Sequence, residues 1–326
     1  MAGKSRLSTP VAELQRKRST RARLGAGNDI SVRPAALPLV ASGDPRQTPR
    51  YLTAARIIHP FPTLLNVAAT AGLAAVAVEG IPDGWLLARM LMMMFFAQSA
   101  IGVTNDVFDE ELDAVAKPWK PIPSGVVSMQ IARSVAVVLV LTALAFAATL
   151  GAAAFALDML GLACGLAYDM ALKRSTLSAA PFMIAIPTLP LWVWVSLDRW
   201  DAALWWIIPL GALIGLSLHL ANTLPDIESD AAHGVRGLAH RLGERASMQL
   251  AWSCFAAALA LAVAITPLVT YELKLFVPTL IGGVSCLVAS ILLGTMDRRA
   301  TALQIAFGVM GVGAAAAAVG WLAAAT

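Results

Sequence analysis

Nine long apolar segments recur along the chain, beginning near residue 59 and ending near residue 325. A helix that crosses a bilayer needs about 20 largely apolar residues, because its backbone polar groups must be paired within the segment once water is excluded. With 58% hydrophobic and 13% charged residues, the chain is also too apolar for one soluble core. The sequence therefore predicts an all-α, multi-pass membrane protein with nine transmembrane helices. They are expected at residues 59–78, 85–104, 129–150, 152–168, 179–197, 203–224, 248–267, 275–294 and 302–325.

The first fifty residues differ in composition from the rest, since they are rich in Arg, Ser, Pro and small residues and show no apolar period. Such a composition is typical of disorder. We expect residues 1–50 to form a disordered basic tail and residues 51–326 to form the membrane domain. The basic run at residues 16–23 could rest on anionic lipid or belong to a transit peptide, but we interpret it as a solvated cytoplasmic tail.

The distribution of lysine and arginine predicts how the helices are oriented, because cytoplasmic loops retain positive charge. With the N-terminus inside, the inner loops carry Lys117, Lys120, Lys173, Arg174, Arg236, Arg241, Arg245, Arg298 and Arg299. The outer side keeps Arg199, Lys274 and Arg89, the last near a helix end from which its side chain can reach the interface. We therefore expect the N-terminus inside and the C-terminus outside, in what we take to be a bacterial inner membrane. The net charge of +4 comes largely from the tail and gives no reason to expect nucleic acid as a partner.

Two acidic clusters stand at the predicted cytoplasmic ends of the second and sixth segments. The first contains Asn105, Asp106, Asp109 and Asp113, and the second contains Asn222, Asp226 and Asp230. Both follow the pattern N-x-x-x-D-x-x-x-D, and a spacing of four puts the members on nearly the same face if the helix continues. Polar residues at membrane helices are costly and usually functional, so the repetition indicates two facing halves of one site or an internal duplication.

The charge of these clusters predicts a cation. Two carboxylates about 6 Å apart repel by roughly 3 kcal/mol at an effective dielectric constant of 20, and the C-terminal end of a helix dipole adds to the repulsion. Hard oxygen ligands suit Mg²⁺, which commonly bridges a few carboxylates to substrate phosphates. A single Asp of this kind is usually a solvated loop residue, but two matching clusters at one membrane face favour a metal site.

Positively charged residues accompany both clusters. Lys117 and Lys120 lie in a loop that reads A-K-P-W-K-P-I-P-S-G, in which three prolines restrict the backbone. Tyr168, Lys173 and Arg174 form a third cytoplasmic group, and Arg236 follows the second cluster. Such side chains could stabilise a departing diphosphate. For any one of them, a purely topological role at a helix end is equally consistent with the sequence, and we favour Lys120 and Lys173 because each adjoins a candidate site element.

The residues around both clusters resemble the signatures of a known family. Residues 105–125 read N-D-V-F-D-E-E-L-D-A-V-A-K-P-W-K-P-I-P-S-G and closely resemble the first signature of the UbiA-type intramembrane prenyltransferases. Residues 225–243, where P-D-I-E-S-D is followed by G-V-R-G-L-A-H-R-L-G, are similar to the second signature. The resemblance extends from about residue 56 to the C-terminus. The sequence departs from the family pattern in two places. Lys120 stands where the family usually has Arg. The spacing after Tyr168 is uncertain by one residue, so either Lys173 or Arg174 could take the role of the family's lysine.

The resemblance implies nine helices around a central cavity and Mg²⁺-dependent transfer of an isoprenoid chain from a polyprenyl diphosphate to an aromatic or lipid acceptor. It implies that Asp109, Asp113, Asp226 and Asp230 are catalytic and that they hold Mg²⁺ together with Asn105. It further implies that the diphosphate is bound by Asn105, Asp106, Lys117, Lys120, Tyr168, Lys173, Arg174, Asn222 and Arg236.

Two other functions are compatible with the same motifs. A cation-coupled transporter also uses acids near broken helices, but these acids should lie near the bilayer midplane rather than at one face. A terpene cyclase or carotenoid elongase of the same type would share the metal site and differ only in the cavity lining. The sequence leaves the acceptor open among 4-hydroxybenzoate, a naphthoate, a chlorin, a glyceryl lipid and a polyene.

Several other polar and aromatic residues lie inside the apolar segments. Asn66 and His219 could face the cavity and orient the acceptor, although a helix-to-helix hydrogen bond explains each at least as well. Asp158 lies inside the fourth segment, where a central position would be costly; the alternative is that it marks the outer end of that helix. The group Trp192, Trp194 and Trp200 is expected to form an aromatic belt at the outer interface.

Overall fold

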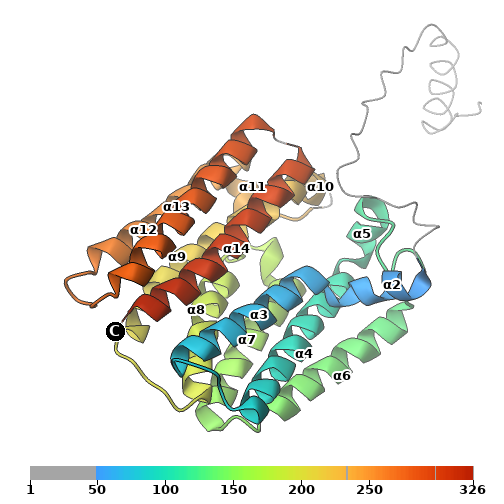
Figure 1. The fold of residues 1–326 in the computed structure, drawn as a ribbon. Coiled ribbons are helices and arrows are strands. Elements are labelled where there is room, and N and C mark those ends of the chain that lie inside the picture. The colour runs from blue at the N-terminus through green and yellow to red at the C-terminus, as the bar shows by residue number, and fades with distance from the viewer. Residues whose placement is uncertain (1–48, 233, 298, 326) are drawn as a thin grey trace, which may run out of the picture. The chain divides into compact units, whose positions relative to one another are not determined.

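The computed structural model describes residues 49–232, 234–297 and 299–325, and their regular structure is helical apart from one isolated β-bridge between Tyr271 and Ala325 (Figure 1). The α-helices are α2 (Arg50–Ala55), α3 (Pro60–Ala77), α4 (Gly84–Phe108), α5 (Glu110–Ala116), α6 (Met129–Ala147), α7 (Ala152–Met170), α8 (Ala180–Ser196), α9 (Leu204–Thr223), α10 (Ile227–Ala232), α11 (Leu238–Leu242), α12 (Glu244–Ala264), α13 (Leu273–Met296) and α14 (Ala300–Ala324). Three short 3-10 helices, η1 (Arg56–Ile58), η2 (Leu172–Arg174) and η3 (Leu224–Asp226), connect them.

The nine apolar segments correspond to nine of these helices. Within the described residues, eight are long and apolar enough to cross a membrane, namely α3, α4, α6, α7, α9, α12, α13 and α14. The ninth, α8, is apolar but has only 17 residues. The prediction of an all-α, multi-pass membrane protein is confirmed, and the helices begin and end within a few residues of the expected positions.

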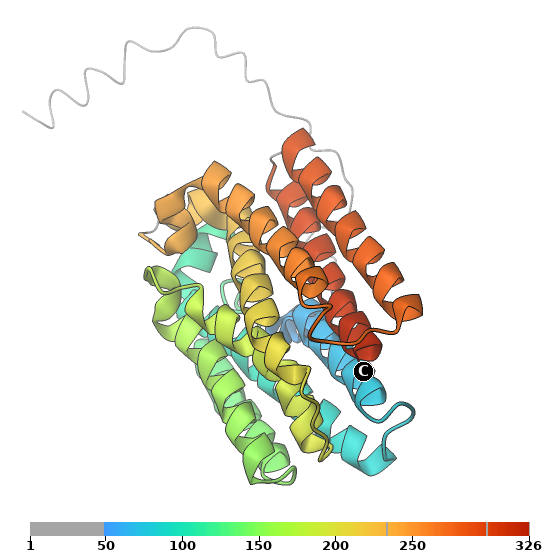
Figure 2. The ribbon, with the colours of Figure 1, turned by 90° about the vertical axis from the view of Figure 1, so that its left-hand side faces the viewer.

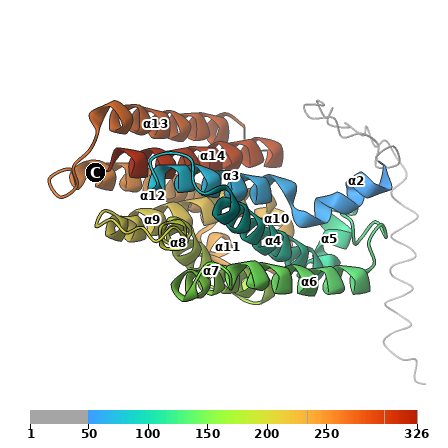
Figure 3. The same cartoon turned by 60° about the horizontal axis from the view of Figure 1, so that its bottom comes forward.

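The helices pack around a common centre. Going round, α3 contacts α4, α4 contacts α7, and α8 and α9 follow in order (Figures 1 and 2). Helix α9 contacts α12, α12 contacts α13, α13 contacts α14, and α14 returns to α3, which closes the ring. Helix α6 packs outside α4, as Figure 3 shows, and contributes no described residue to the cavity lining. This arrangement brings the ends of α4, α7 and α9 to the same end of the bundle.

Helices α8 and α9 approach each other closely because glycine lines their contact. A Cβ atom added to Gly215 would lie 2.4 Å from the backbone oxygen of Phe182, and one added to Gly211 would lie 2.7 Å from Pro187 Cβ. Small residues spaced by four allow membrane helices to pack backbone against backbone. The contact fixes Phe182 of α8 beside His219 of α9, with ring centroids 5.1 Å apart.

The expected tryptophan belt is wrong for two of its three members. Trp192 and Trp194 are 2% and 6% exposed, whereas Trp200 is 54% exposed and packs edge-on against Trp205. The two buried residues belong to α8, which is held between α7 and α9 and is apolar around its whole circumference. Trp192 lines the central cavity and Trp194 belongs to the buried apolar core, so neither side chain reaches the interface.

Residues 1–48 lie outside the described residues, and so does nearly all of the proposed tail. At the boundary, Arg50 already belongs to α2.

Candidate active site

A cavity of about 740 Å³ occupies the centre of the helix bundle. Side chains from α3, α4, α7, α8, α9, α12, α13 and α14 line it, together with residues of the short helices and loops that connect them. Its charged lining residues gather at the end where α4, α7 and α9 terminate, apart from Asp158, and the remainder of the wall is mainly apolar. We call the charged end the mouth of the cavity.

The first acidic cluster does not lie on one continuous helix. Helix α4 ends at Phe108, Asp109 takes the non-helical backbone angles φ −99° and ψ 7°, and α5 begins at Glu110. The backbone N–H of Asp109 still donates to the Asn105 carbonyl at 2.9 Å, and that of Asp113 donates to the Asp109 carbonyl at 2.7 Å. Asn105, Asp109 and Asp113 all line the cavity despite the break.

The second cluster reaches the same mouth from α9. Pro225 has no backbone N–H to donate, and the chain passes through η3 before α10 begins. Asn222, Asp226 and Asp230 line the cavity. Residues of both clusters therefore face one mouth, although they are far apart in the sequence.

Three lysines pair with the carboxylates of the mouth. Lys173, which is 9% exposed, donates to both oxygens of Asp109. Lys120 Nζ lies 2.8 Å from Asp106 Oδ1 and 2.6 Å from Asp113 Oδ2. Lys117, from the loop after the first cluster, donates to Asp226 Oδ2 of the second at 2.8 Å.

The pKa values outside the membrane spans reflect this crowding of charge. Burial raises the pKa of Asp113 in spite of its bond to Lys120, and the charges of Asp109 and Asp106 raise it further. Burial opposes the charge of Lys120, but Asp106 and Asp113 together raise its pKa. Burial and the charge of Asp226 raise the pKa of Asp230 to about 6. Each of these effects arises because several ionisable groups share a small, poorly solvated volume.

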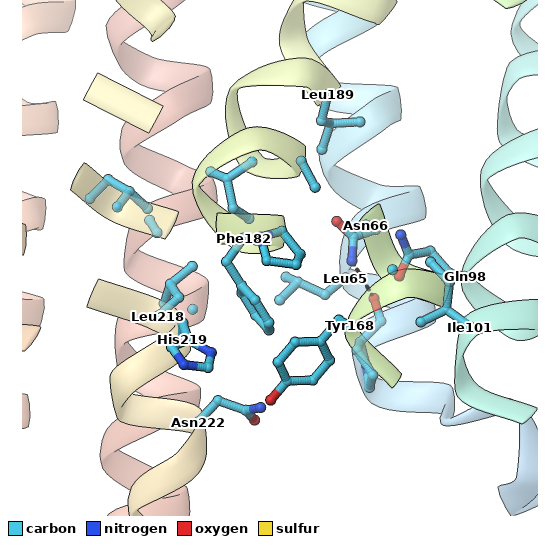
Figure 4. A pocket seen from close by; sticks show the side chains of 18 of the residues that line it. Leu65, Asn66, Gln98, Ile101, Tyr168, Phe182, Leu189, Leu218, His219 and Asn222 are labelled. Atoms are coloured by element: carbon cyan, nitrogen blue, oxygen red, sulfur yellow. Dashed lines mark hydrogen bonds between the residues drawn. The ribbon is translucent and has the colours of Figure 1, made fainter. Parts of the chain in front are cut away.

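An aromatic group lies just inside the mouth. Tyr168 packs edge-on against Phe182 at 5.1 Å and against His219 at 5.8 Å between ring centroids. Figure 4 shows the Tyr168 hydroxyl directed toward the side chain of Asn222, with Asn66 and Gln98 on the opposite wall. His219 Nε2 lies 3.0 Å from Ser178 Oγ, which also accepts the backbone N–H of Leu238. The carboxamide of Asn66 donates to the carbonyl of Pro62 in its own helix.

The structure places the thirteen sequence-derived site residues in three groups. Ten line the cavity: Asn105, Asp109, Asp113, Lys117, Lys120, Tyr168, Lys173, Asn222, Asp226 and Asp230. Asp106 is 2% exposed and is held behind the mouth by Lys120 and His59. Arg174 and Arg236 are exposed and are not among the described lining residues. Of the two candidate residues after Tyr168, Lys173 is the one in the cavity.

Three residues of the mouth had not been expected there. His59 Nε2 lies 2.9 Å from Asp106 Oδ1. Asp169 Oδ1 accepts a hydrogen bond of 2.9 Å from Asn105 Nδ2, which leaves the amide oxygen of Asn105 for another partner. His240 Nε2 is 3.9 Å from Asp230 Oδ2. The sequence offered a partial signal for Asp169, which directly follows Tyr168 at the end of α7, and for His240, which lies in the second signature, but none for His59.

The oxygen atoms at the mouth are chemically suited to Mg²⁺. Among the described residues, no three His, Cys, Asp or Glu side chains converge closely enough to form a metal cage. Mg²⁺ does not require one, because it usually keeps several waters and binds a few carboxylates together with substrate phosphates. Carboxylates of Asp109, Asp113, Asp226 and Asp230 and the amide oxygen of Asn105 supply that type of donor at one mouth.

Comparison with known proteins identifies the class of the protein. The model of the UbiA prenyltransferase family matches residues 65–311, which is most of the chain. The fold, the motifs and this match define a multi-pass membrane prenyltransferase. The chain belongs to the UbiA prenyltransferase family, and the resemblance seen in its two signatures is confirmed.

Individual relatives agree with this assignment. The digeranylgeranylglyceryl phosphate synthase of Methanoregula boonei is 31% identical over 201 residues, which cover 58% of this chain and 70% of the relative. The 4-hydroxybenzoate octaprenyltransferase of Yersinia enterocolitica is 31% identical over 163 residues, covering 49% and 50% of the two chains. The structure of a UbiA homolog from Archaeoglobus fulgidus bound to GPP and Mg²⁺ has a TM-score of 0.63 at 16% identity and covers 84% of this chain and 99% of that one. At this identity the structural likeness shows the fold alone.

Proposed function

We propose that this prenyltransferase binds an isoprenoid diphosphate with Mg²⁺ at the mouth of its cavity and transfers the isoprenoid chain to an aromatic or lipid acceptor. The observation that carries the proposal is the division of one cavity into a mouth and an apolar interior. Acids of both clusters and the three lysines line the mouth, whereas mainly apolar side chains line the interior. A diphosphate with an apolar tail has the same division of polarity.

At the mouth, the protein's own groups provide an electrostatic site for the diphosphate. Lys117, Lys120 and Lys173 each donate to a carboxylate, and the same ammonium groups can donate to phosphate oxygens. When bound to Asn105, Asp109, Asp113, Asp226 and Asp230, Mg²⁺ would neutralise the charge that develops on the leaving diphosphate. The bond that breaks joins the allylic carbon to the diphosphate oxygen, and the oxygen keeps the electron pair.

Inside the mouth, aromatic side chains can stabilise the resulting allylic cation. Tyr168 and Phe182 line the cavity and lie edge to face, and a cation is attracted to the face of such a ring. The apolar wall behind them limits the access of water, which would otherwise capture the cation. The acceptor's nucleophilic carbon or oxygen then forms the new bond to the allylic carbon, and the proton displaced from the acceptor leaves to a base.

Two acceptor classes are proposed for this protein. The names of the relatives point to a glyceryl phosphate in one case and a hydroxybenzoate in another, which is why we propose both acceptor classes. A cyclase or elongase that ionises the same donor is the second candidate, because the mouth would serve it equally. A cation-coupled transporter is disfavoured by the position of the acids at one end of the bundle and by family membership.

We also propose that the mouth faces the cytoplasm of a bacterial cell. The loops that carry Lys117, Lys120, Lys173, Arg174 and Arg236 leave the bundle at the mouth, and positive charge is retained on the cytoplasmic side.

A direct test uses the purified protein in detergent or lipid discs with Mg²⁺, geranylgeranyl diphosphate and a panel of acceptors. The panel includes 4-hydroxybenzoate, a glyceryl lipid phosphate and a polyene. We expect diphosphate release that depends on one acceptor class and stops when the metal is chelated. Release with a cyclised product and no acceptor would favour the cyclase, and no release with any donor would contradict the proposal.

A further inference from the structure

One carboxyl group lies deep in the apolar part of the cavity, away from the mouth. Asp158 of α7 is 9% exposed and lines the cavity together with Trp192 of α8, which is 2% exposed. The lysines and histidines that line the cavity are Lys117, Lys120, Lys173, His59, His219 and His240, and all belong to the loops or helix ends at the mouth. Asp158 therefore has no cation beside it within the described lining.

The indole N–H of Trp192 approaches the carboxyl group of Asp158 without forming a hydrogen bond of good geometry, so the hydrogen-bonding capacity of the pair is not fully used. The indole of Trp192 lies beside the carboxyl group of Asp158. Within the described part of the chain, neither Trp192 Nε1 nor Asp158 Oδ2 makes a hydrogen bond. A buried indole N–H or carboxyl oxygen normally has a partner, because an unpaired polar group in hydrocarbon is costly. The missing partner is a group that a ligand can supply.

Two glycines of α7 line the cavity between the mouth and Asp158: Ile101 packs closely against Gly165, whereas the space beside Gly161 is open. Tyr168 at the mouth and Asp158 lie on the same helix, ten residues apart, which corresponds to about 15 Å along the helix axis. Gly161 lies between them and lines the cavity, and a Cβ atom added to it would meet no atom within 4 Å. An extended chain whose head is held at the mouth can therefore run along this face of α7 to Asp158.

We propose that Asp158 and Trp192 form a hydrogen-bonding subsite for a hydroxyl group on the chain of the isoprenoid diphosphate donor, remote from its reacting end. A hydroxyl group matches both partners at once, since it donates to a carboxyl oxygen and accepts from the indole N–H. A hydrocarbon would satisfy neither partner. The proposal rests on the proposed function, because the diphosphate at the mouth fixes the position of the chain.

The test compares two probes that differ by one hydroxyl group. Farnesyl diphosphate and its analogue with a hydroxyl group at the tail end are titrated against the full-length protein in detergent with Mg²⁺, and the ratio of their dissociation constants is measured. We expect the wild-type protein to bind the hydroxylated probe at least as tightly as farnesyl diphosphate. In Asp158→Leu we expect the hydroxylated probe to bind about tenfold more weakly relative to farnesyl diphosphate, because its hydroxyl group then lacks a partner.

Trp192→Phe serves as the second variant. We expect it, like Asp158→Leu, to bind the hydroxylated probe more weakly relative to farnesyl diphosphate than the wild-type protein does. A purely structural contact between Asp158 and Trp192 would lower thermal stability in both variants without changing the ratio, and that result would overturn the subsite. The subsite would also be overturned if the wild-type protein discriminated against the hydroxylated probe as strongly as Asp158→Leu does. Failure of the wild-type protein to bind either diphosphate would instead contradict the proposed function and the subsite that depends on it.

Discussion

Asp109 occupies the position where α4 breaks, and its carboxylate accepts both of its contacts from the buried ammonium of Lys173. Both side chains line the mouth, and one comes from the first acidic cluster while the other follows α7. The pair therefore couples the proposed metal site to the proposed diphosphate site through one contact.

We expect Asp109→Asn and Asp226→Asn each to reduce the rate of diphosphate release by at least about 100-fold, because each removes a charged oxygen ligand from one half of the site. The measurement is the initial rate of release with Mg²⁺ and geranylgeranyl diphosphate. Glu111→Gln makes the same charge change at an exposed position of α5 and should leave the rate unchanged. A normal rate in either Asp variant would exclude that residue from the metal site.

Lys120 has a different role, since one ammonium group serves two buried carboxylates, Asp106 and Asp113. Replacing it with Met should lower the free energy of unfolding by about 3 kcal/mol, because breaking a buried ion pair leaves its partners uncompensated. Lys120→Arg keeps the charge and should unfold near the wild-type temperature. Thermal unfolding of the two variants in the same detergent tests this, and equal stability of Lys120→Met and wild type would show that the ion pairs contribute nothing.

At the scale of the helices, Gly215 decides how closely α9 approaches α8. A Cβ atom at this position would lie 2.4 Å from the Phe182 carbonyl oxygen, so the backbones must separate. We expect Gly215→Ala to destabilise the protein by about 2 kcal/mol and to weaken donor binding, because Phe182 and His219 face the cavity from these helices. Gly282→Ala on α13 meets no atom within 4 Å and should be neutral. Unfolding temperature and donor affinity distinguish the two variants.

The sequence predicted the helices well because apolar length determines them. The expected segment 179–197 corresponds to Ala180–Ser196, and 203–224 corresponds to Leu204–Thr223. The break at Asp109 was not predicted, since no Pro or Gly marks it and the spacing of four suggested one continuous face. The change from α9 to η3 in the second cluster was not predicted either, although Pro225 marks it in the sequence.

The site was predictable where its residues belong to a local motif and not where they meet through packing. The two acidic clusters and the three lysines stand in recognisable stretches of sequence. His59 contacts Asp106 across 47 positions, and Asp169 contacts Asn105 across 64. Such pairs depend on the way α3, α4 and α7 pack together, which hydrophobic periodicity does not specify. The tryptophans of α8 were misplaced for the same reason.

At the scale of the whole molecule, the outer surface of the helix ring suits a bilayer. Val137, Val138 and Leu141 of α6 are 58%, 60% and 60% exposed, and Val288 and Leu292 of α13 are 48% and 53% exposed. Apolar side chains in such numbers on an outer face would not remain in contact with water in a soluble monomer. The polar contacts of the mouth are therefore enclosed by helices whose outer faces are available to lipid.

The proposed orientation predicts which loops an impermeant reagent can reach in a bacterial host. Ser124→Cys lies in the exposed loop beside the mouth, and Thr266→Cys lies in the exposed turn between α12 and α13 at the other end. The native Cys164 and Cys254 are buried and Cys286 is partly buried in α13, so they should react little. We expect a membrane-impermeant maleimide to label Thr266→Cys in spheroplasts and Ser124→Cys only after lysis, because the positive loops stay inside. Labelling of Ser124→Cys in sealed spheroplasts would place the mouth on the outer side, and the diphosphate donor would then have to be supplied there.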